Sequence, residues 1–142
     1  MPTKIVILGA GPGGYVAAIR AAQLGAEVTV IEKDNVGGTC LNWGCIPSKV
    51  MKTTSVMYEN FSKADEFGIS TTGIFHPDMT RLAARKKTVI KNQAQGILGL
   101  FEQHQIRYTV GNGTITGPGT VLVSRKDASP DEVKWDKHPF VY

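Results

Sequence analysis

The sequence predicts an α/β fold in which helices cover a parallel sheet, together with a small antiparallel β segment. A short β-branched run, Lys4–Leu8, precedes a glycine-rich turn and an alanine-rich helix over Tyr15–Leu24, which Gly25 should end. A second apolar run, Glu27–Glu32, follows directly. Strands that are apolar throughout are typical of a parallel sheet with both faces covered.

The middle of the chain predicts two further helices and a third strand. One helix is expected over Pro47–Phe67, with Gly68 ending it. Asp78 is the predicted N-cap of a long helix that reaches Gln103, and Ile106–Val110 is the third strand. The apolar residues of the long helix fall on one stripe: Leu82, Val89, Ile90, Ile97, Leu98 and Phe101.

Turn residues divide the following segment. The residue pair at 112–113 and the residue triplet at 117–119 contain glycine and predict turns. Short β segments are expected beside them, at 114–116 and 120–124. These two segments form the predicted antiparallel pair. The polar tail from Lys126 onward shows no pattern of either element, so no strand or helix is predicted there.

Composition excludes several classes of protein. The 142 residues are 42% hydrophobic and carry a net charge of +4, which is typical of one globular domain. The basic residues are spread out, and the densest cluster, at 85–87, is expected to be a solvated helix face, so no nucleic-acid partner is predicted. The first apolar run is too short to span a bilayer and has no signal-peptide pattern, which predicts a cytoplasmic protein without a membrane partner.

A glycine fingerprint, Gly9-x-Gly11-x-x-Gly14, lies between the first strand and the first helix. Gly9 permits a tight turn, Gly11 lets the backbone approach a pyrophosphate, and Gly14 lets the helix pack closely on the strand. The helix N-terminus then directs N–H groups and a positive dipole end at the phosphates. Glu32 ends the second strand about 20 residues later, where a carboxylate accepts hydrogen bonds from ribose hydroxyls. This pattern predicts a Rossmann-type dinucleotide site and leaves FAD and NAD open.

Both cysteines, Cys40 and Cys45, lie in a glycine-rich segment just after the fingerprint. A redox pair is the favoured interpretation, and two unrelated buried thiols or a metal site are the alternatives. Structural zinc usually takes four ligands and no histidine is near in sequence, so no metal is predicted. Positions five apart in a regular helix lie about 7.5 Å apart along its axis, too far for a disulfide. Gly44 gives the chain the freedom to distort from such a helix, and Pro47 fits near a helix start, which places Cys45 near a helix N-terminus that favours the thiolate.

The fingerprint, Glu32 and above all the cysteine segment resemble the pyridine nucleotide–disulfide oxidoreductases of class I, and the resemblance extends to about Val123. Within that family it is greatest to the members that oxidise dihydrolipoamide. The resemblance implies that the fingerprint binds FAD, that Glu32 holds the adenosine ribose and that Lys49 lies beside the flavin. It also implies that Cys45 contacts the flavin and Cys40 exchanges with substrate. The expected site consists of Cys40 and Cys45 as catalytic residues and of Gly9, Gly11, Pro12, Gly13, Gly14, Glu32, Lys33, Gly38, Thr39, Cys45 and Lys49 as cofactor-binding residues.

The implied reaction is the oxidation of a dithiol by NAD⁺ to a disulfide and NADH. The implied partners are the lipoyl domain of a 2-oxo acid dehydrogenase complex and a second subunit of a homodimer. Family members are much longer, so residues 1–142 are expected to form the N-terminal part of an incomplete FAD-binding domain. The NAD-binding and C-terminal dimerisation domains would then be absent, and the isolated chain inactive. The alternatives are another disulfide or mercuric ion as substrate, and a nucleotide-binding module without turnover.

Overall fold

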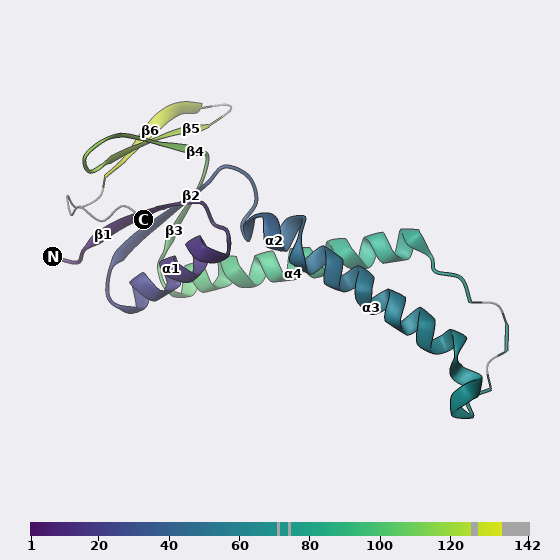
Figure 1. The fold of residues 1–142 in the computed structure, drawn as a ribbon. Coiled ribbons are helices and arrows are strands. Elements are labelled where there is room, and N and C mark those ends of the chain that lie inside the picture. The colour runs from purple at the N-terminus through teal and green to yellow at the C-terminus, as the bar shows by residue number, and fades with distance from the viewer. Residues whose placement is uncertain (71, 74, 126–127, 135–142) are drawn as a thin grey trace.

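The structure is a computed structural model that describes residues 1–70, 72–73, 75–125 and 128–134. This part of the chain forms two small sheets and several helices (Figure 1). The first sheet is parallel, in the order β1-β2-β3, and consists of β1 (Lys4–Leu8), β2 (Glu27–Glu32) and β3 (Arg107–Val110). The second is antiparallel, in the order β4-β5-β6, and consists of β4 (Asn112–Gly117), β5 (Thr120–Arg125) and β6 (Ala128–Lys134). The predicted fold class is confirmed.

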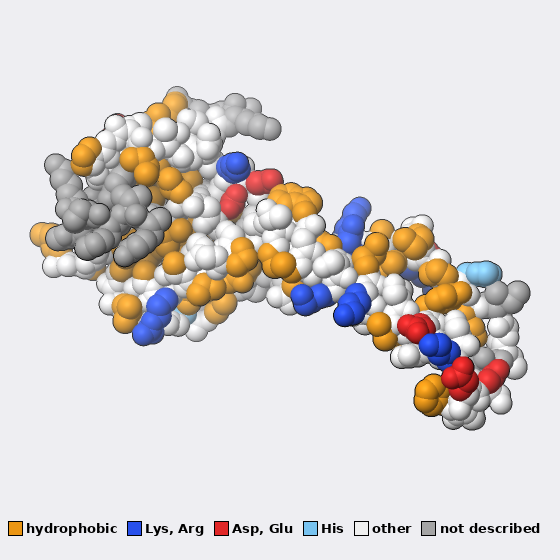
Figure 2. Space-filling view, viewed as in Figure 1, with side chains coloured by type: hydrophobic (Ala, Val, Ile, Leu, Met, Phe, Trp, Pro, Cys, Tyr) orange, Lys and Arg blue, Asp and Glu red, His pale blue; other side chains and the backbone are white. Residues whose placement is uncertain are grey.

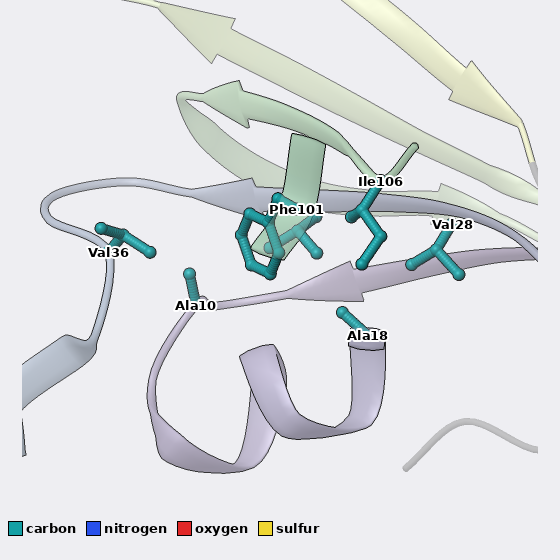
Figure 3. Close-up of a cluster of buried hydrophobic side chains, with 7 residues drawn as sticks. Ala10, Ala18, Val28, Val36, Phe101 and Ile106 are labelled. Carbon is teal, nitrogen blue, oxygen red and sulfur yellow. The ribbon is translucent and has the colours of Figure 1, made fainter. Parts of the chain in front are cut away.

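The helical face of the parallel sheet contains the main hydrophobic core (Figure 3). Val28 and Val30 of β2 point to this face, as alternation along a strand requires. They meet Ala18 of α1 (Pro12–Gln23), Ile106, and Phe101 near the end of α4 (Met79–Gln103). Phe101 is only 1% exposed, so burial of this ring fixes the end of the long helix against the sheet.

The opposite face of the parallel sheet is covered by the antiparallel sheet. Ile31, the neighbour of Val30 in β2, packs against Val121 and Val123 of β5. All three side chains are at most 2% exposed. The central strand β2 is therefore buried on both faces, and β1 contacts both clusters through half-buried Ile7 and Val6, which explains why the two strands are apolar without alternation.

The first helix begins earlier than predicted. Residue Pro12, not Tyr15, is its first residue, because proline has a fixed φ suited to a first helical position and Gly11 precedes it as the N-cap. Gly13 and Gly14 therefore lie within the first helical turn. The end agrees with the sequence: Gly25 has a φ of 87°, the left-handed conformation that closes many helices.

Helices α3 (Cys45–Ser62) and α4 lie side by side and extend away from the two sheets (Figure 1). Helix α3 begins at Cys45, two residues before the predicted start at Pro47, and its predicted end is wrong, because it stops at Ser62 and not at Phe67. A separate 3₁₀ turn, η1 (Ala64–Phe67), follows and ends at Gly68, whose φ is 73°.

The predicted stripe of α4 is confirmed, because all six of its apolar residues are buried or half-buried. Other apolar side chains of this helix pair stay exposed, and Figure 2 shows hydrophobic groups along it. Within the described residues, no helix has the length and apolar character needed to cross a membrane.

Asp78 caps α4 as predicted: the Arg81 N–H donates a hydrogen bond to the Asp78 Oδ1 atom at 3.0 Å. We expect Asp78→Ala to lower the free energy of unfolding by about 1 kcal/mol, because one backbone donor of the first turn loses its acceptor. Urea unfolding followed by circular dichroism measures this change. Asp78→Asn keeps an acceptor oxygen and should retain most of the stability, so an equal loss in both variants would contradict the capping role.

Strand β6 corrects the prediction that the tail has no regular structure. Val121 pairs with Val133 and Val123 with Asp131, so β6 is the outer strand of the antiparallel sheet. The polar composition of β6 gave no strand pattern in the sequence. An outer strand presents one edge to water, so it tolerates charged residues and a proline such as Pro130. Residues 135–142 lie outside the described part of the chain.

The dipeptide at 112–113 is a second correction. Asn112 and Gly113 were expected to form a turn, but they begin β4 and pair with Ser124 and Val123. The turn residues at 117–119 do connect β4 and β5, so the predicted antiparallel pair itself is confirmed.

Candidate functional site

A pocket of about 630 Å³ lies at the carboxyl edge of the parallel sheet. One wall is part of the glycine turn after β1, a turn that comprises residues 9–14. The other walls are residues 32–35 at the end of β2, residues 38–40 of the short helix α2 (Gly38–Asn42), and residues 111–113 after β3. Two hydrogen bonds join the glycine turn and residues 111–113 to β2: Gly9 N–H donates to the Ile31 carbonyl (2.7 Å) and Gly111 N–H to the Glu32 carbonyl (2.8 Å). Ligands of open α/β sheets bind at this edge.

The glycine turn brings backbone segments closer together than side chains would allow. Gly9 has a φ of 97°, which a tight turn out of β1 requires. A Cβ atom on Gly14 would overlap the Gly9 carbonyl oxygen, so only glycine lets α1 start this close to the strand. Gly38 has a φ of 59°, and its Cβ would lie 2.7 Å from the Gly11 Cα atom. The first turn of α2 therefore rests directly on the glycine turn.

The N-terminus of α1 is suited to an anion. Among the described residues, no side chain caps this end, and its first turn contains no acidic residue. A Cβ atom on Gly13 would meet nothing within 4 Å, so the space beside the turn is open. Unpaired N–H groups and the positive end of the helix dipole at such a site favour a phosphate group.

Glu32 connects two walls of the pocket. Its side chain is buried, and its two carboxylate oxygens accept hydrogen bonds from the backbone N–H groups of Ala10 (2.6 Å) and Asp34 (2.9 Å). Burial and the negative charge of Glu32 raise the pKa of Tyr108, which keeps that phenol protonated beside the carboxylate. Sequence reasoning assigned Glu32 only to the ligand and missed its contact with the glycine turn, for which no sequence pattern exists.

We expect Glu32→Gln to lower the free energy of unfolding by about 2 kcal/mol in the absence of any nucleotide. The amide replaces one acceptor oxygen with a donor, which leaves one buried backbone N–H without a partner. Urea unfolding of the nucleotide-free chain measures the change. Glu27→Gln is the matched control in the same strand, because Glu27 is exposed and its ion pairs with Lys4 (3.9 Å) and Arg107 (3.6 Å) lie at the surface. Equal stability of both variants would show that Glu32 acts on the ligand alone.

The two cysteines form a disulfide, with 4.7 Å between their Cα atoms. The short helix α2 was not predicted; it ends before Trp43 and Gly44, and Cys45 then begins α3, so Cys45 lies at a helix N-terminus as predicted. A Cβ atom on Gly44 would lie 3.2 Å from the Thr39 carbonyl oxygen, which shows how closely the two helices approach. Cys40 lines the pocket, whereas Cys45 is exposed. The disulfide excludes two unrelated thiols, and no group of three or more metal-ligating side chains occurs in the described residues.

The remaining predicted site residues divide into two groups. Those that line the pocket are Gly9, Gly11, Pro12, Glu32, Lys33, Gly38 and Thr39. Gly13, Gly14, Cys45 and Lys49 do not line it, and Lys49 is an exposed residue of α3. Sequence reasoning missed the lining residues Asp34, Asn35, Trp43 and 111–113. The position of residues 111–113 directly after the third parallel strand was the signal that could have identified them.

The fold and the site together define a nucleotide-binding domain with a disulfide beside its pocket. Residues 3–137 match the sequence model of the pyridine nucleotide-disulphide oxidoreductases, and this chain belongs to that family.

Its relatives include the mitochondrial dihydrolipoyl dehydrogenase of Dictyostelium discoideum, which is 44% identical over 127 residues, and the dihydrolipoyl dehydrogenase of Bacillus subtilis, which is 40% identical over 136 residues. These alignments cover 88% and 91% of the chain but 26% and 28% of the two relatives. The crystal structure of LpdA from Mycobacterium tuberculosis superposes with a TM-score of 0.79 at 26% identity, over 94% of this chain and 30% of that one. The chain therefore spans little more than a quarter of the length of these relatives.

Proposed function

We propose that this chain forms the FAD-binding part of a disulfide oxidoreductase that oxidises protein-bound dihydrolipoamide with NAD⁺. One observation supports this most directly: the Cys40–Cys45 disulfide borders the pocket that contains the glycine turn. A redox-active sulfur pair beside a nucleotide site is the arrangement that electron transfer between thiols and a dinucleotide needs. The names of the relatives favour dihydrolipoamide over other disulfides or mercuric ion as the substrate.

The residues present fit FAD. The open N-terminus of α1 and the glycine turn would hold the pyrophosphate, and Glu32 would face the ribose with the acceptor capacity that its two backbone contacts leave free. Gly38 and Thr39 of α2 would complete the wall next to the disulfide. FAD held there would supply an electron acceptor for the reduced cysteines and a hydride donor for NAD⁺.

The cysteines carry out the thiol chemistry. The family resemblance assigns the exchange with substrate to Cys40, although Cys45 is the more exposed of the two cysteines. A substrate thiolate attacks the Cys40 sulfur, forms a mixed disulfide and releases Cys45 as a thiolate. The second substrate thiol then displaces Cys40, which leaves the substrate as a disulfide and the protein as a dithiol. Cys45 is well suited to be the leaving group, because it is the first residue of α3 and the helix N-terminus stabilises the negative charge of its thiolate. Exposed Lys49, on the same helix, adds a positive charge one turn further on.

The proposed partners follow from this substrate: a lipoyl domain of a 2-oxo acid dehydrogenase complex and a second subunit of a homodimer. The cytoplasm remains the proposed location, although relatives in Dictyostelium discoideum and Arabidopsis thaliana are named as mitochondrial proteins.

Two measurements on the chain test the proposal. Titration with FAD, followed by flavin fluorescence, should show saturable binding that is tighter than the binding of NAD⁺ measured by calorimetry. Mixing the oxidised chain with dihydrolipoamide should yield one lipoamide and a Cys40–Cys45 dithiol per chain, counted with a thiol reagent. Tighter binding of NAD⁺ than of FAD, or a disulfide that does not react with dihydrolipoamide, would contradict the proposal.

A further inference from the structure

Asn42 lies between the two cysteines and ends the short helix α2. Its side chain is half-buried and donates two hydrogen bonds from its Nδ2 atom, to the Gly38 carbonyl (2.9 Å) and to the Val36 carbonyl (3.1 Å). Both acceptors precede Cys40 in the chain. The Asn42 amide therefore connects the last residue of α2 to the residues at the start of the helix.

The segment held by Asn42 is the one that rests on the glycine turn. Gly37 N–H donates a hydrogen bond to the Ala10 carbonyl (2.8 Å), and Gly38 approaches Gly11 backbone to backbone. A continuous series of contacts therefore runs from the glycine turn through residues 36–38 to the Asn42 amide.

A helix as short as α2 needs such contacts to exist. It comprises only Gly38–Asn42, about one turn, and the first turn of a helix is unfavourable because several dihedral angles are fixed for a single hydrogen bond. Two glycines at its start, Gly37 and Gly38, add to that entropic cost. The Asn42 amide supplies two such contacts, which join the last residue of α2 to the residues at its start.

We propose that Asn42 is a positioning residue that sets the reduction equilibrium of the Cys40–Cys45 pair. This inference rests on the proposed redox role of the pair. By holding α2 in the dithiol state, Asn42 keeps the two sulfurs near each other and favours closure of the disulfide. Without its two hydrogen bonds, the dithiol samples more open conformations and the disulfide becomes easier to reduce.

The test uses dithiothreitol as the reductant: two thiols of dithiothreitol reduce Cys40–Cys45 to the dithiol and become one cyclic disulfide. The equilibrium constant is measured in buffers of reduced and oxidised dithiothreitol by trapping free thiols and counting them by mass spectrometry. Asn42→Asp keeps the size of the side chain but removes both donors, and Asn42→Ala removes them without adding a charge. Each should shift the equilibrium toward the dithiol about tenfold, which corresponds to about 30 mV.

Asn92→Asp is the matched control, because Asn92 is exposed on α4 and far along the chain from the cysteines. It should leave the equilibrium within twofold of the wild-type value. Thermal unfolding of the reduced variants shows whether each remains folded. Folded Asn42 variants with the wild-type equilibrium would overturn the inference, as would an equal shift in the control. A wild-type disulfide that dithiothreitol cannot reduce reversibly would instead contradict the proposed function.

Discussion

Replacing either cysteine, as Cys40→Ser or Cys45→Ser, should abolish the oxidation of dihydrolipoamide by the chain. A single remaining thiol has no disulfide bond to exchange, so no electron pair can leave the substrate by this route. The assay mixes each variant with dihydrolipoamide and measures lipoamide by chromatography, and both variants should give only the background of the buffer.

The control is Ser55→Ala, an exposed position of α3 whose hydroxyl donates to the Met51 carbonyl of its own helix (3.3 Å). It should yield the wild-type amount of lipoamide. Persistent lipoamide formation by a cysteine variant would mean that oxidation takes place elsewhere, and the disulfide would then be structural.

Gly14→Ala should lower the free energy of unfolding by about 3 kcal/mol, which is large for the addition of one methyl group. The new Cβ atom would overlap the Gly9 carbonyl oxygen, a backbone atom that no rotamer change can move. Helix α1 would have to shift away from β1 and open the glycine turn, so FAD affinity should fall as well. Urea unfolding and FAD titration measure the two effects.

Gly13→Ala is the matched control one residue earlier in the same helical turn. Its Cβ atom would meet nothing within 4 Å, and alanine is a better helix former than glycine by about 0.5–1 kcal/mol. Its stability should therefore stay the same or rise. If both variants lost stability equally, helix propensity rather than the close approach to Gly9 would have to explain the result.

The parts of the fold that sequence reasoning predicted correctly are those with local signals. The apolar runs of β1 and β2 reflect burial on both faces, and the cap at Asp78 and the stop at Gly25 are encoded in single residues. The departure from a regular helix between the two cysteines could be predicted, because a regular helix keeps residues five apart too distant for a disulfide.

The parts that were missed depend on contacts between distant segments. Asn112 and Gly113 have a strong local preference for a turn, but pairing with β5 places them in a strand. The polar residues of β6 show no strand pattern, because its register is determined by β5. The contact of Glu32 with Ala10 joins residues 22 positions apart and leaves no periodic trace in the sequence.

The position along the chain of the segments that line the pocket has a consequence for the evolution of this protein. The chain leaves the pocket wall at Trp43 and returns at Gly111, and between these points it forms the α3–α4 pair that extends away from both sheets (Figure 1). Insertions or deletions around the connection from η1 to α4 leave every lining residue in place. Natural selection can therefore remodel the outer part of this helical arm for new neighbours while the nucleotide pocket is inherited unchanged.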